Sequence, residues 1–211
     1  PAGDDPLPGW RVAKRNRYME NRGVKKSARK PGKSAVKLSG RVSKTDYYLD
    51  IAQKVAARST CLRRNYGAVI VNNDQIIATG YNGAPRGTKN CIDVGQCYRE
   101  MLGIKRGERY ELCRGVHAEM NAIIHASRFD MLGGTIFVAG LDGKTKEPLE
   151  GAMCCRMCKR MIINAGIANV VIRDGEAGII RADVDKDWAR KNMGELRFKG
   201  GKLVPVKLSG Y

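Results

Sequence analysis

Two stretches of the chain decide the fold that we expect: VHAEMNAII at residues 116–124 and CRMCKRMIINAG at residues 155–166. In each stretch, apolar residues recur at helical spacing after a start that carries polar or sulfur-containing side chains. We expect one helix over residues 116–128 and another over residues 155–164, with Gly166 near its C-cap. Reactive groups in the first turn of a helix lie where backbone N–H groups stabilise thiolates.

The side chains at these helix starts have the chemistry of a catalytic metal site. One imidazole and two thiolates are ligands that Zn²⁺ prefers, and three protein ligands leave a fourth position for water. We therefore expect a zinc site formed by His117, Cys155 and Cys158. Cys154 offers a second ligand register, but only Cys155 with Cys158 has the usual C-x-x-C spacing. Glu119 is not needed as a ligand, so its carboxylate can move protons.

The composition indicates one globular domain with an appendage. The 211 residues are 43% hydrophobic and 28% charged, which is typical of a folded protein. No stretch approaches the roughly 18 to 20 apolar residues of a membrane span, and residues 1–9 do not resemble a signal segment. We therefore expect a cytoplasmic protein without membrane contact. Its seven cysteines are then expected to be thiols or metal ligands rather than disulfides.

The formal charge of +18 is concentrated at the two ends of the chain. Residues 1–44 contain thirteen Lys or Arg and three acidic residues, and residues 186–211 contain seven and two. We expect a flexible basic extension over residues 1–43, a catalytic domain over residues 44–188 and a basic C-terminal tail over residues 189–211. Basic ends on a balanced domain indicate tails that contact polyanions such as nucleic acid, or that keep the protein in solution.

Helix and strand patterns alternate through the expected domain. A helix should begin near Lys44, with Thr45 or Asp46 as its cap. Short apolar runs predict strands over residues 67–71, 76–81, 135–139 and 169–173. The first two flank Asn72-Asn73-Asp74, a strong hairpin signal, whereas residues 82–114 should form a long loop of the kind that is usually functional. This alternation predicts an α/β layered fold.

Four segments of the chain carry a resemblance to a known family. They are RSTCLRRNYGAVIV at 58–71, GYNGAPRG at 80–87, CRGVHAEMNAI at 113–123 and CRMCKRMIINAGI at 155–167. Together they resemble the cytidine deaminase superfamily, and more narrowly the deoxycytidylate deaminases, whose H-x-E and C-x-x-C motifs occur in zinc deaminases of cytosine or adenine. The resemblance implies a three-layer αβα fold with a mixed sheet of about five strands and helices on both faces.

The resemblance also implies a reaction. It implies a hydrolase that acts on the cyclic amidine C–N bond of dCMP, producing dUMP and ammonia and so supplying dUMP for dTMP synthesis. His117, Cys155 and Cys158 would hold the Zn²⁺, and Glu119 would transfer a proton from water to N3 and then to the leaving amine. The stretch DGEAGIIRADVDKDW, residues 174–188, contains no obvious aromatic residue to stack on the base.

The same family relationship suggests substrate contacts and partners. Asn82 is suited to hydrogen-bonding the sugar or phosphate, because flanking glycines permit close approach. Arg86 and Arg128 are candidates for phosphate contacts, with ordinary surface charge as the alternative. In this family an arginine at the position of Arg128 is associated with nucleotide binding between subunits, and some members are activated by dCTP and inhibited by dTTP. A homo-oligomer, a hexamer by family resemblance, is therefore implied, with these nucleotides as candidate effectors.

Four further cysteines predict a second metal site. They are Cys61, Cys91, Cys97 and Cys113. A structural Zn²⁺ held by four thiolates would tether the long loop, which has little core of its own. Some deoxycytidylate deaminases carry a second zinc near this place, with partly different ligands. Buried free thiols are the alternative.

Two other functions remain open from the sequence. A tRNA or single-stranded DNA base deaminase would share the zinc motif and use the basic ends as electrostatic guides. A non-catalytic nucleic-acid-binding protein could keep the fold without the chemistry. The GYNGAPRG segment favours the mononucleotide enzymes over the first, and an intact Glu119 argues against the second.

Overall fold

The computed structural model of the protein describes residues 40–105, 108–199 and 202–206. Apart from residues 40–43, the predicted basic extension lies outside this part of the chain. Among the described residues, no helix combines the length and the apolar character that crossing a membrane requires.

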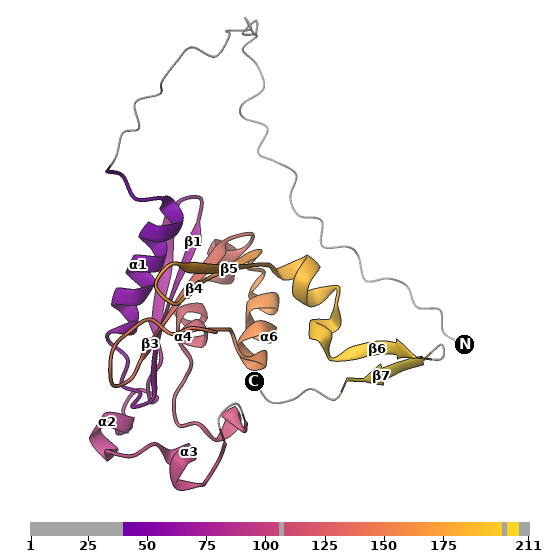
Figure 1. Ribbon diagram of the computed structural model, residues 1–211. Helices are drawn as coiled ribbons and strands as arrows, with labels where there is room; N and C mark the ends of the chain where they lie inside the picture. Colours follow the sequence, from indigo (N-terminus) through magenta and orange to yellow (C-terminus); the bar gives the residue numbers. More distant parts are fainter. Residues whose placement is uncertain (1–39, 106–107, 200–201, 207–211) are drawn as a thin grey trace, which may run out of the picture. The chain divides into compact units, whose positions relative to one another are not determined.

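A mixed five-stranded sheet forms the centre of the domain (Figure 1). Its strands are β1 (Arg64–Asn72), β2 (Gln75–Tyr81), β3 (Thr135–Asp142), β4 (Asn169–Asp174) and β5 (Gly178–Asp183). They lie in the order β2-β1-β3-β4-β5, and β3 and β4 form the parallel pair among antiparallel neighbours. The prediction of a mixed sheet of about five strands is confirmed. The edge strand β5 was not predicted, because its side chains are mostly exposed or half-buried and give no clear alternation.

The predicted hairpin joins β1 to β2 through a two-residue turn. Asn72 pairs with Gln75, so Asn73 and Asp74 are the two turn residues. Both have positive φ, 48° and 65°, as a type I′ turn requires. Such a turn matches the right-handed twist of the strands and sets the register of the sheet edge.

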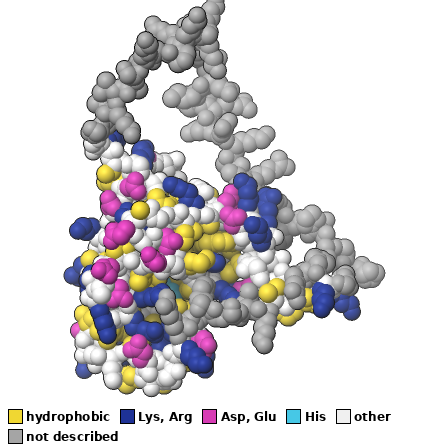
Figure 2. Space-filling model, in the orientation of Figure 1, with side chains coloured by type: hydrophobic (Ala, Val, Ile, Leu, Met, Phe, Trp, Pro, Cys, Tyr) yellow, Lys and Arg dark blue, Asp and Glu magenta, His cyan; other side chains and the backbone are white. Residues whose placement is uncertain are grey.

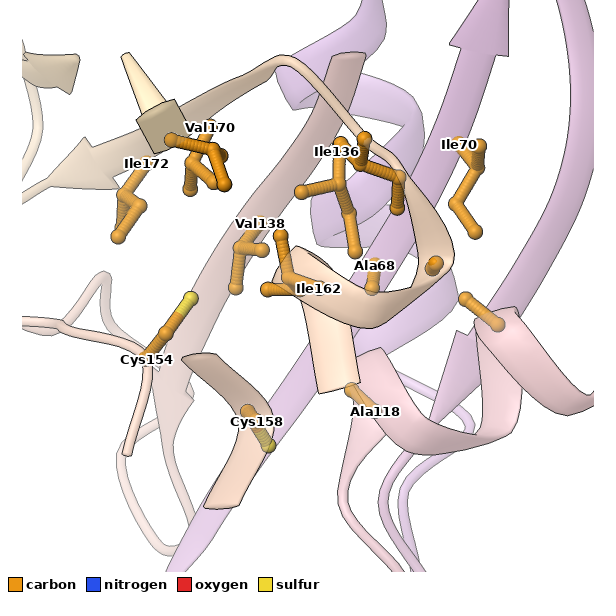
Figure 3. Packing of buried hydrophobic residues seen from close by; sticks show 14 of the residues in the cluster. Ala68, Ile70, Ala118, Ile136, Val138, Cys154, Cys158, Ile162, Val170 and Ile172 are labelled. Atoms are coloured by element: carbon orange, nitrogen blue, oxygen red, sulfur yellow. The ribbon is translucent and has the colours of Figure 1, made fainter. Parts of the chain in front are cut away.

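Helices cover both faces of the sheet, so the domain has three layers (Figure 1). Helix α1 (Lys44–Ala56) packs on one face against side chains that include Val69, Val71 and Phe137. Helices α4 (Ala118–Ile124) and α6 (Arg156–Ala165) pack on the other face. There they meet the alternate residues of the same strands: Ala68, Ile70, Ile136, Val138, Val170 and Ile172 (Figure 3). The period of two in the strands separates the two cores.

Two glycines allow helices to contact the sheet backbone to backbone. A Cβ on Gly67 of β1 would lie 2.1 Å from the Ala52 carbonyl oxygen in α1. A Cβ on Gly80 of β2 would lie 2.3 Å from the Ala122 nitrogen in α4. Gly80 begins the GYNG segment, so its small size serves helix packing rather than the approach of a ligand.

Two predicted helix boundaries are wrong. The cap of α1 is Ser43, whose Oγ accepts a hydrogen bond from the Asp46 backbone N–H at 3.1 Å. The helix predicted over residues 116–128 ends at Ile124, and Ser127 caps a separate short helix, α5 (Arg128–Met131). The Oγ atom of Ser127 accepts a hydrogen bond from the Phe129 backbone N–H at 3.3 Å and so caps the start of a new helix. Arg128 therefore does not continue the helix that carries Glu119.

The long loop and the C-terminal segment contain short elements. Between β2 and α4 lie α2 (Cys91–Val94), α3 (Tyr98–Met101) and the 3₁₀ turn η1 (Tyr110–Leu112). After β5 come η2 (Val184–Ala189), η3 (Asn192–Gly194) and a hairpin of β6 (Leu196–Lys199) and β7 (Lys202–Pro205). An ion pair of 2.9 Å between Arg160 and Glu195 joins α6 to the segment before the hairpin. Part of the predicted basic tail, residues 189–211, is therefore ordered secondary structure.

Candidate active site

Three ligand side chains meet where α4 and α6 begin. His117 is the N-cap residue of α4, Cys155 is the N-cap residue of α6, and Cys158 lies one turn into α6. The Nδ1 atom of His117 lies 3.3 Å from the Cys155 sulfur and 3.4 Å from the Cys158 sulfur. All three ligand atoms lie within 4.8 Å of one another. Of the candidate ligands, the structure thus brings together the C-x-x-C pair and the histidine.

The spacing of these atoms fits zinc. With Zn–S of about 2.3 Å and Zn–N of about 2.0 Å, tetrahedral angles place a nitrogen and a sulfur about 3.5 Å apart. The observed 3.3 and 3.4 Å are close to this separation. The donor set, one imidazole nitrogen and two sulfurs, is also the set that a catalytic zinc prefers. The residues present therefore fit the metal that the sequence predicts.

The pKa values of His117, Cys155 and Cys158, the triad, show that the three groups interact. The hydrogen bond from Cys158, together with His117, lowers the pKa of Cys155 to about 4 despite its burial. The bond to Cys155 and burial raise the pKa of Cys158. Burial lowers the pKa of His117, but its contact with Cys155 and the charge of Glu119 raise it above its usual value. The site thus concentrates negative charge on sulfur, which a bound cation would stabilise.

Glu119 is a buried carboxylate beside the triad. Its side chain is 5% exposed and lies on the wall of the same pocket as His117 and Cys155. The thiol of Cys154, itself 1% exposed, hydrogen-bonds this carboxylate. Cys154 therefore contacts the acid rather than joining the cluster of three ligand atoms.

The triad opens into a cavity of about 580 Å³, a size typical of small-molecule sites. Its walls come from the start of β1, the segment after β2, the long loop and the starts of α4 and α6. The charged, polar and aromatic side chains of the wall include Arg63, Arg64, Tyr66, Asn82, Arg99, Tyr110, His117, Glu119 and Cys155. The four cysteines predicted to form a second metal site also line this cavity.

Two tyrosines supply the aromatic walls that the sequence did not predict. Tyr66 lies in β1, and its ring contacts the position of Gly140 on β3. Tyr110 lies in the long loop, with its ring edge-on to His117 at 5.6 Å between centroids. Trp188 is the aromatic residue of the stretch 174–188, but it is buried with Lys159 over its ring and does not line the cavity. The period of two in RRNYGAVIV could have indicated Tyr66, because it shares a face with Ala68.

Asn82 lines the cavity while its amide joins the ends of two strands. Its Oδ1 accepts a hydrogen bond from the Tyr66 backbone N–H at 2.7 Å. Its Nδ2 donates to the Arg64 carbonyl at 2.9 Å. The amide thus continues the pairing of β1 and β2 beyond Tyr81, and one N–H of its Nδ2 remains for another acceptor.

The two arginines predicted to contact phosphate are not in the cavity wall. Arg86 lies 3.2 Å from His125 Nε2, and the Nδ1 of that ring lies 3.0 Å from the Thr79 carbonyl. Arg128 donates from Nε to the Asn164 carbonyl at 3.2 Å. The arginines that do line the cavity are Arg63, Arg64 and Arg99.

The four remaining cysteines approach one another at one side of the cavity. Burial raises the pKa of Cys91, and the charges of Cys61, Cys113 and Cys97 add to this effect. Burial likewise raises the pKa of Cys113, which also senses Cys61 and Cys97. All four thiols line the same cavity, three of them from the long loop and Cys61 from the segment between α1 and β1. Their ligand atoms are less tightly grouped than those of the triad.

Comparison with known proteins identifies the family of this chain. Residues 42–173 match the family model of the cytidine and deoxycytidylate deaminase zinc-binding region. The deoxycytidylate deaminase of Mycobacterium phage D29 is 37% identical over 131 residues, which cover 60% of this chain and 91% of that protein. The enzyme of the same name from Saccharomyces cerevisiae is 37% identical over 62% of this chain but 38% of its own length. The apo crystal structure of dCMP deaminase from the cyanophage S-TIM5 has 24% identity and a TM-score of 0.42, covering 62% of this chain and 82% of that one. The chain therefore belongs to the cytidine and deoxycytidylate deaminase family.

Proposed function

We propose that this protein converts dCMP and water to dUMP and ammonia with the help of one catalytic Zn²⁺. The observation that carries the proposal is one cavity that contains both the three-ligand cluster and the Glu119 carboxylate. In the reaction a C–O bond forms at C4 of cytosine, the C4–N bond breaks, and the amino group leaves as ammonia. Relatives named deoxycytidylate deaminase support dCMP as the substrate.

Protein groups would move the protons of this reaction. His117, Cys155 and Cys158 would hold the Zn²⁺, which supplies a Lewis acid that makes water reactive near neutral pH. Glu119 would accept the proton that the attacking water loses and deliver it to N3. It would then take the second proton of that water from the new C4 hydroxyl and give it to the departing amine. Its burial keeps these transfers out of bulk solvent.

The cavity walls would orient the base and sugar. Tyr66 and Tyr110 provide aromatic surface in the same cavity as His117 and Glu119, which suits a flat pyrimidine. Asn82 would donate its remaining amide N–H to the sugar or phosphate, while its two backbone hydrogen bonds hold the side chain in place. These contacts would fix the base with C4 toward the three ligands.

A second, structural Zn²⁺ would stabilise the long loop. Its ligands would be Cys61, Cys91, Cys97 and Cys113. The charge of Arg114 favours the thiolate of Cys91, and that of Arg99 favours the thiolate of Cys113. Four thiolates around Zn²⁺ carry excess negative charge, which these arginines would offset. The loop that carries Tyr110 would then be fixed against the catalytic cavity.

We further propose that copies of the chain associate through the outer face near α4 and α5. Large apolar side chains are exposed there: Tyr81, Ile124, Phe129 and Leu132. Phe129 is 83% exposed, and apolar surface of this kind marks interaction sites. Arg128 adjoins Phe129, and Arg86 contacts His125 at the end of α4. Both arginines would thus lie close to a subunit boundary, where dCTP or dTTP could bind in the hexamer that the family resemblance implies.

A nucleic-acid substrate is less favoured than the mononucleotide. On the face seen in Figure 2, acidic side chains lie among the basic ones, whereas polynucleotide binding depends on clustered positive charge. The basic extension could still contact nucleic acid as a secondary property. The proposed role, supplying dUMP for dTMP synthesis, belongs to the cytoplasm.

The proposed function is tested by ammonia release from dCMP by the full chain, beside cytidine, deoxycytidine, dCTP, tRNA and single-stranded DNA. We expect turnover of dCMP that Glu119→Ala lowers by several orders of magnitude while zinc content stays unchanged, because Glu119 is not a ligand. Deamination of an oligonucleotide without turnover of dCMP would refute the proposal. Absence of turnover on every substrate, with zinc bound, would favour a non-catalytic protein.

A further inference from the structure

The cavity has a cationic side that none of the predicted substrate contacts explains. Arg63, Arg64 and Arg99 line it, whereas Arg86 and Arg128 do not. A nucleotide carries its base and its 5′-phosphate at opposite ends, so a cavity that directs C4 toward the metal ligands must meet the phosphate elsewhere on its wall. A guanidinium on that wall is the natural partner for phosphate oxygens.

Strand geometry places Arg64 next to the proposed base site. Arg64 and Tyr66 are two residues apart in β1, so their side chains point to the same face of the sheet, about 6.6 Å apart along the strand. Ala68 and Ile70 continue that face into the core beneath α4 and α6. Arg64 is the first residue of the strand. It therefore lies beyond Tyr66, on the side away from the core.

The other two cavity arginines are engaged by a carboxylate or by backbone carbonyls. Arg63 Nε pairs with a Glu100 oxygen at 2.9 Å. The Nη2 of Arg99 donates to the carbonyls of Lys105 and Glu108, and its guanidinium lies 4.6 Å from the Tyr110 ring centroid.

In contrast, Arg64 forms no ion pair with a carboxylate in the described residues. Its guanidinium hydrogen-bonds the phenol of Tyr66. Asp142, its pairing partner on β3, already accepts hydrogen bonds from the backbone N–H groups of Lys144 and Thr145 at 2.8 and 3.1 Å. The backbone N–H groups of Lys144 and Thr145, and to a smaller degree the charges of Lys144 and Arg64, lower the pKa of Asp142. The Arg64 charge is thus partly offset, but its guanidinium keeps N–H donors for another acceptor.

We propose that Arg64 binds the 5′-phosphate of the nucleotide and so makes the enzyme prefer a nucleotide over a nucleoside. The proposal rests on the proposed deaminase function of the same cavity. A guanidinium can use one edge for the Tyr66 phenol and the other for two phosphate oxygens, which an ammonium group cannot do. Tyr66 then has two tasks: its ring faces the base site and its hydroxyl orients the phosphate-binding side chain.

The test compares dCMP with deoxycytidine in the zinc-loaded full chain carrying Arg64→Gln, Arg64→Lys or the control Arg190→Gln. Arg190 lies outside the cavity wall and pairs with Asp185 at an exposed site. We expect Arg64→Gln to lower kcat/KM for dCMP by about 10- to 100-fold, with deoxycytidine changed less than about twofold. Arg64→Lys should recover part of the loss, and Arg190→Gln should match the wild type.

A binding titration separates this proposal from the proposed function. The affinity for the product dUMP should fall by a similar factor in Arg64→Gln, while the weaker affinity for deoxyuridine stays the same. Equal losses for nucleotide and nucleoside, unchanged affinity for dUMP, or a selective loss in Arg86→Gln or Arg128→Gln instead would overturn the assignment. If the wild type deaminates neither dCMP nor deoxycytidine, the proposed function fails, and the dUMP titration alone decides the role of Arg64.

Discussion

The thiol of Cys154 donates a hydrogen bond to the carboxylate of Glu119, joining the residue before the N-cap of α6 to the first turn of α4. Burial and the charge of Glu119 raise the pKa of this thiol, so it remains a donor. The bond therefore helps to orient the carboxylate that we propose transfers protons.

Replacement of Cys154 should affect turnover more than substrate binding. In Cys154→Ala the carboxylate loses a donor, and we expect kcat to fall about 3- to 10-fold, since a hydrogen bond to a charged group contributes about 1.5 kcal/mol or less for a weak thiol donor. The KM for dCMP and the zinc content should stay near the wild type. Cys154→Ser keeps a donor and is the matched control. Loss of zinc in Cys154→Ala would show that this thiol supports the metal site instead.

Metal analysis should find two zinc ions per chain. Cys91→Ser should reduce this number to one, because the four-thiolate cluster would lose a ligand, and should also lower the thermal stability of the protein. His117→Ala should likewise leave one zinc but abolish dCMP turnover with little effect on the loop. Elemental analysis with differential scanning fluorimetry measures both quantities. One zinc in the wild type, retained in Cys91→Ser, would mean that the four cysteines are free thiols.

A methyl group at Gly80 should disturb the packing of α4 on β2. The added Cβ would lie 2.3 Å from backbone nitrogen of Ala122, which cannot yield like a flexible side chain. We expect Gly80→Ala to lower the free energy of unfolding by about 1–3 kcal/mol and Tm by roughly 2–12 °C. Gly115→Ala is the control, because the nearest atom to its added Cβ would be 3.6 Å away. Equal Tm values for the two variants would contradict the close contact.

Stability should fall at alkaline pH partly through Tyr66. Burial raises the pKa of this phenol above 10 in the folded state, so above pH 10 the unfolded chain loses a proton that the folded chain keeps. The contribution of the protonated phenol to the free energy of unfolding is complete below pH 10. It is lost as the pH rises toward the folded-state pKa, by up to about 1.4 kcal/mol per pH unit. Urea unfolding from pH 9 to 11.5 should therefore show a smaller decline for Tyr66→Phe. Parallel declines for the two proteins would exclude this contribution.

The sequence predicts the metal triad because local spacing determines it. His117 and the Cys155 and Cys158 pair occupy helix starts, and each helix needs only its own residues to place them. The hairpin at Asn73 and Asp74 is equally local. Both features could be predicted from short stretches of sequence.

Features that depend on distant partners were harder to predict. The end of α4 is an exception, since it depends on the nearby Ser127, which caps a new helix and places Arg128 outside α4. Tyr66 and Arg64 face the cavity only because β1 has this phase in the sheet, and the phase depends on pairing with β3. Asn82 looked like a ligand contact from its glycine neighbours, but the ends of β1 and β2 use most of its amide.

The backbone contact at Gly80 has a consequence for chemistry as well as for folding. Asn121 of α4 donates to the Tyr81 carbonyl of β2 at 2.7 Å, so the helix is fastened to the strand just beyond that glycine. His117 precedes this helix and Asn82 follows this strand, so the packing of α4 on β2 sets the position of His117 relative to Asn82. We therefore expect zinc affinity to depend on the packing of the core. A substitution that displaces α4 from the sheet by a fraction of an ångström should weaken zinc binding before it unfolds the protein.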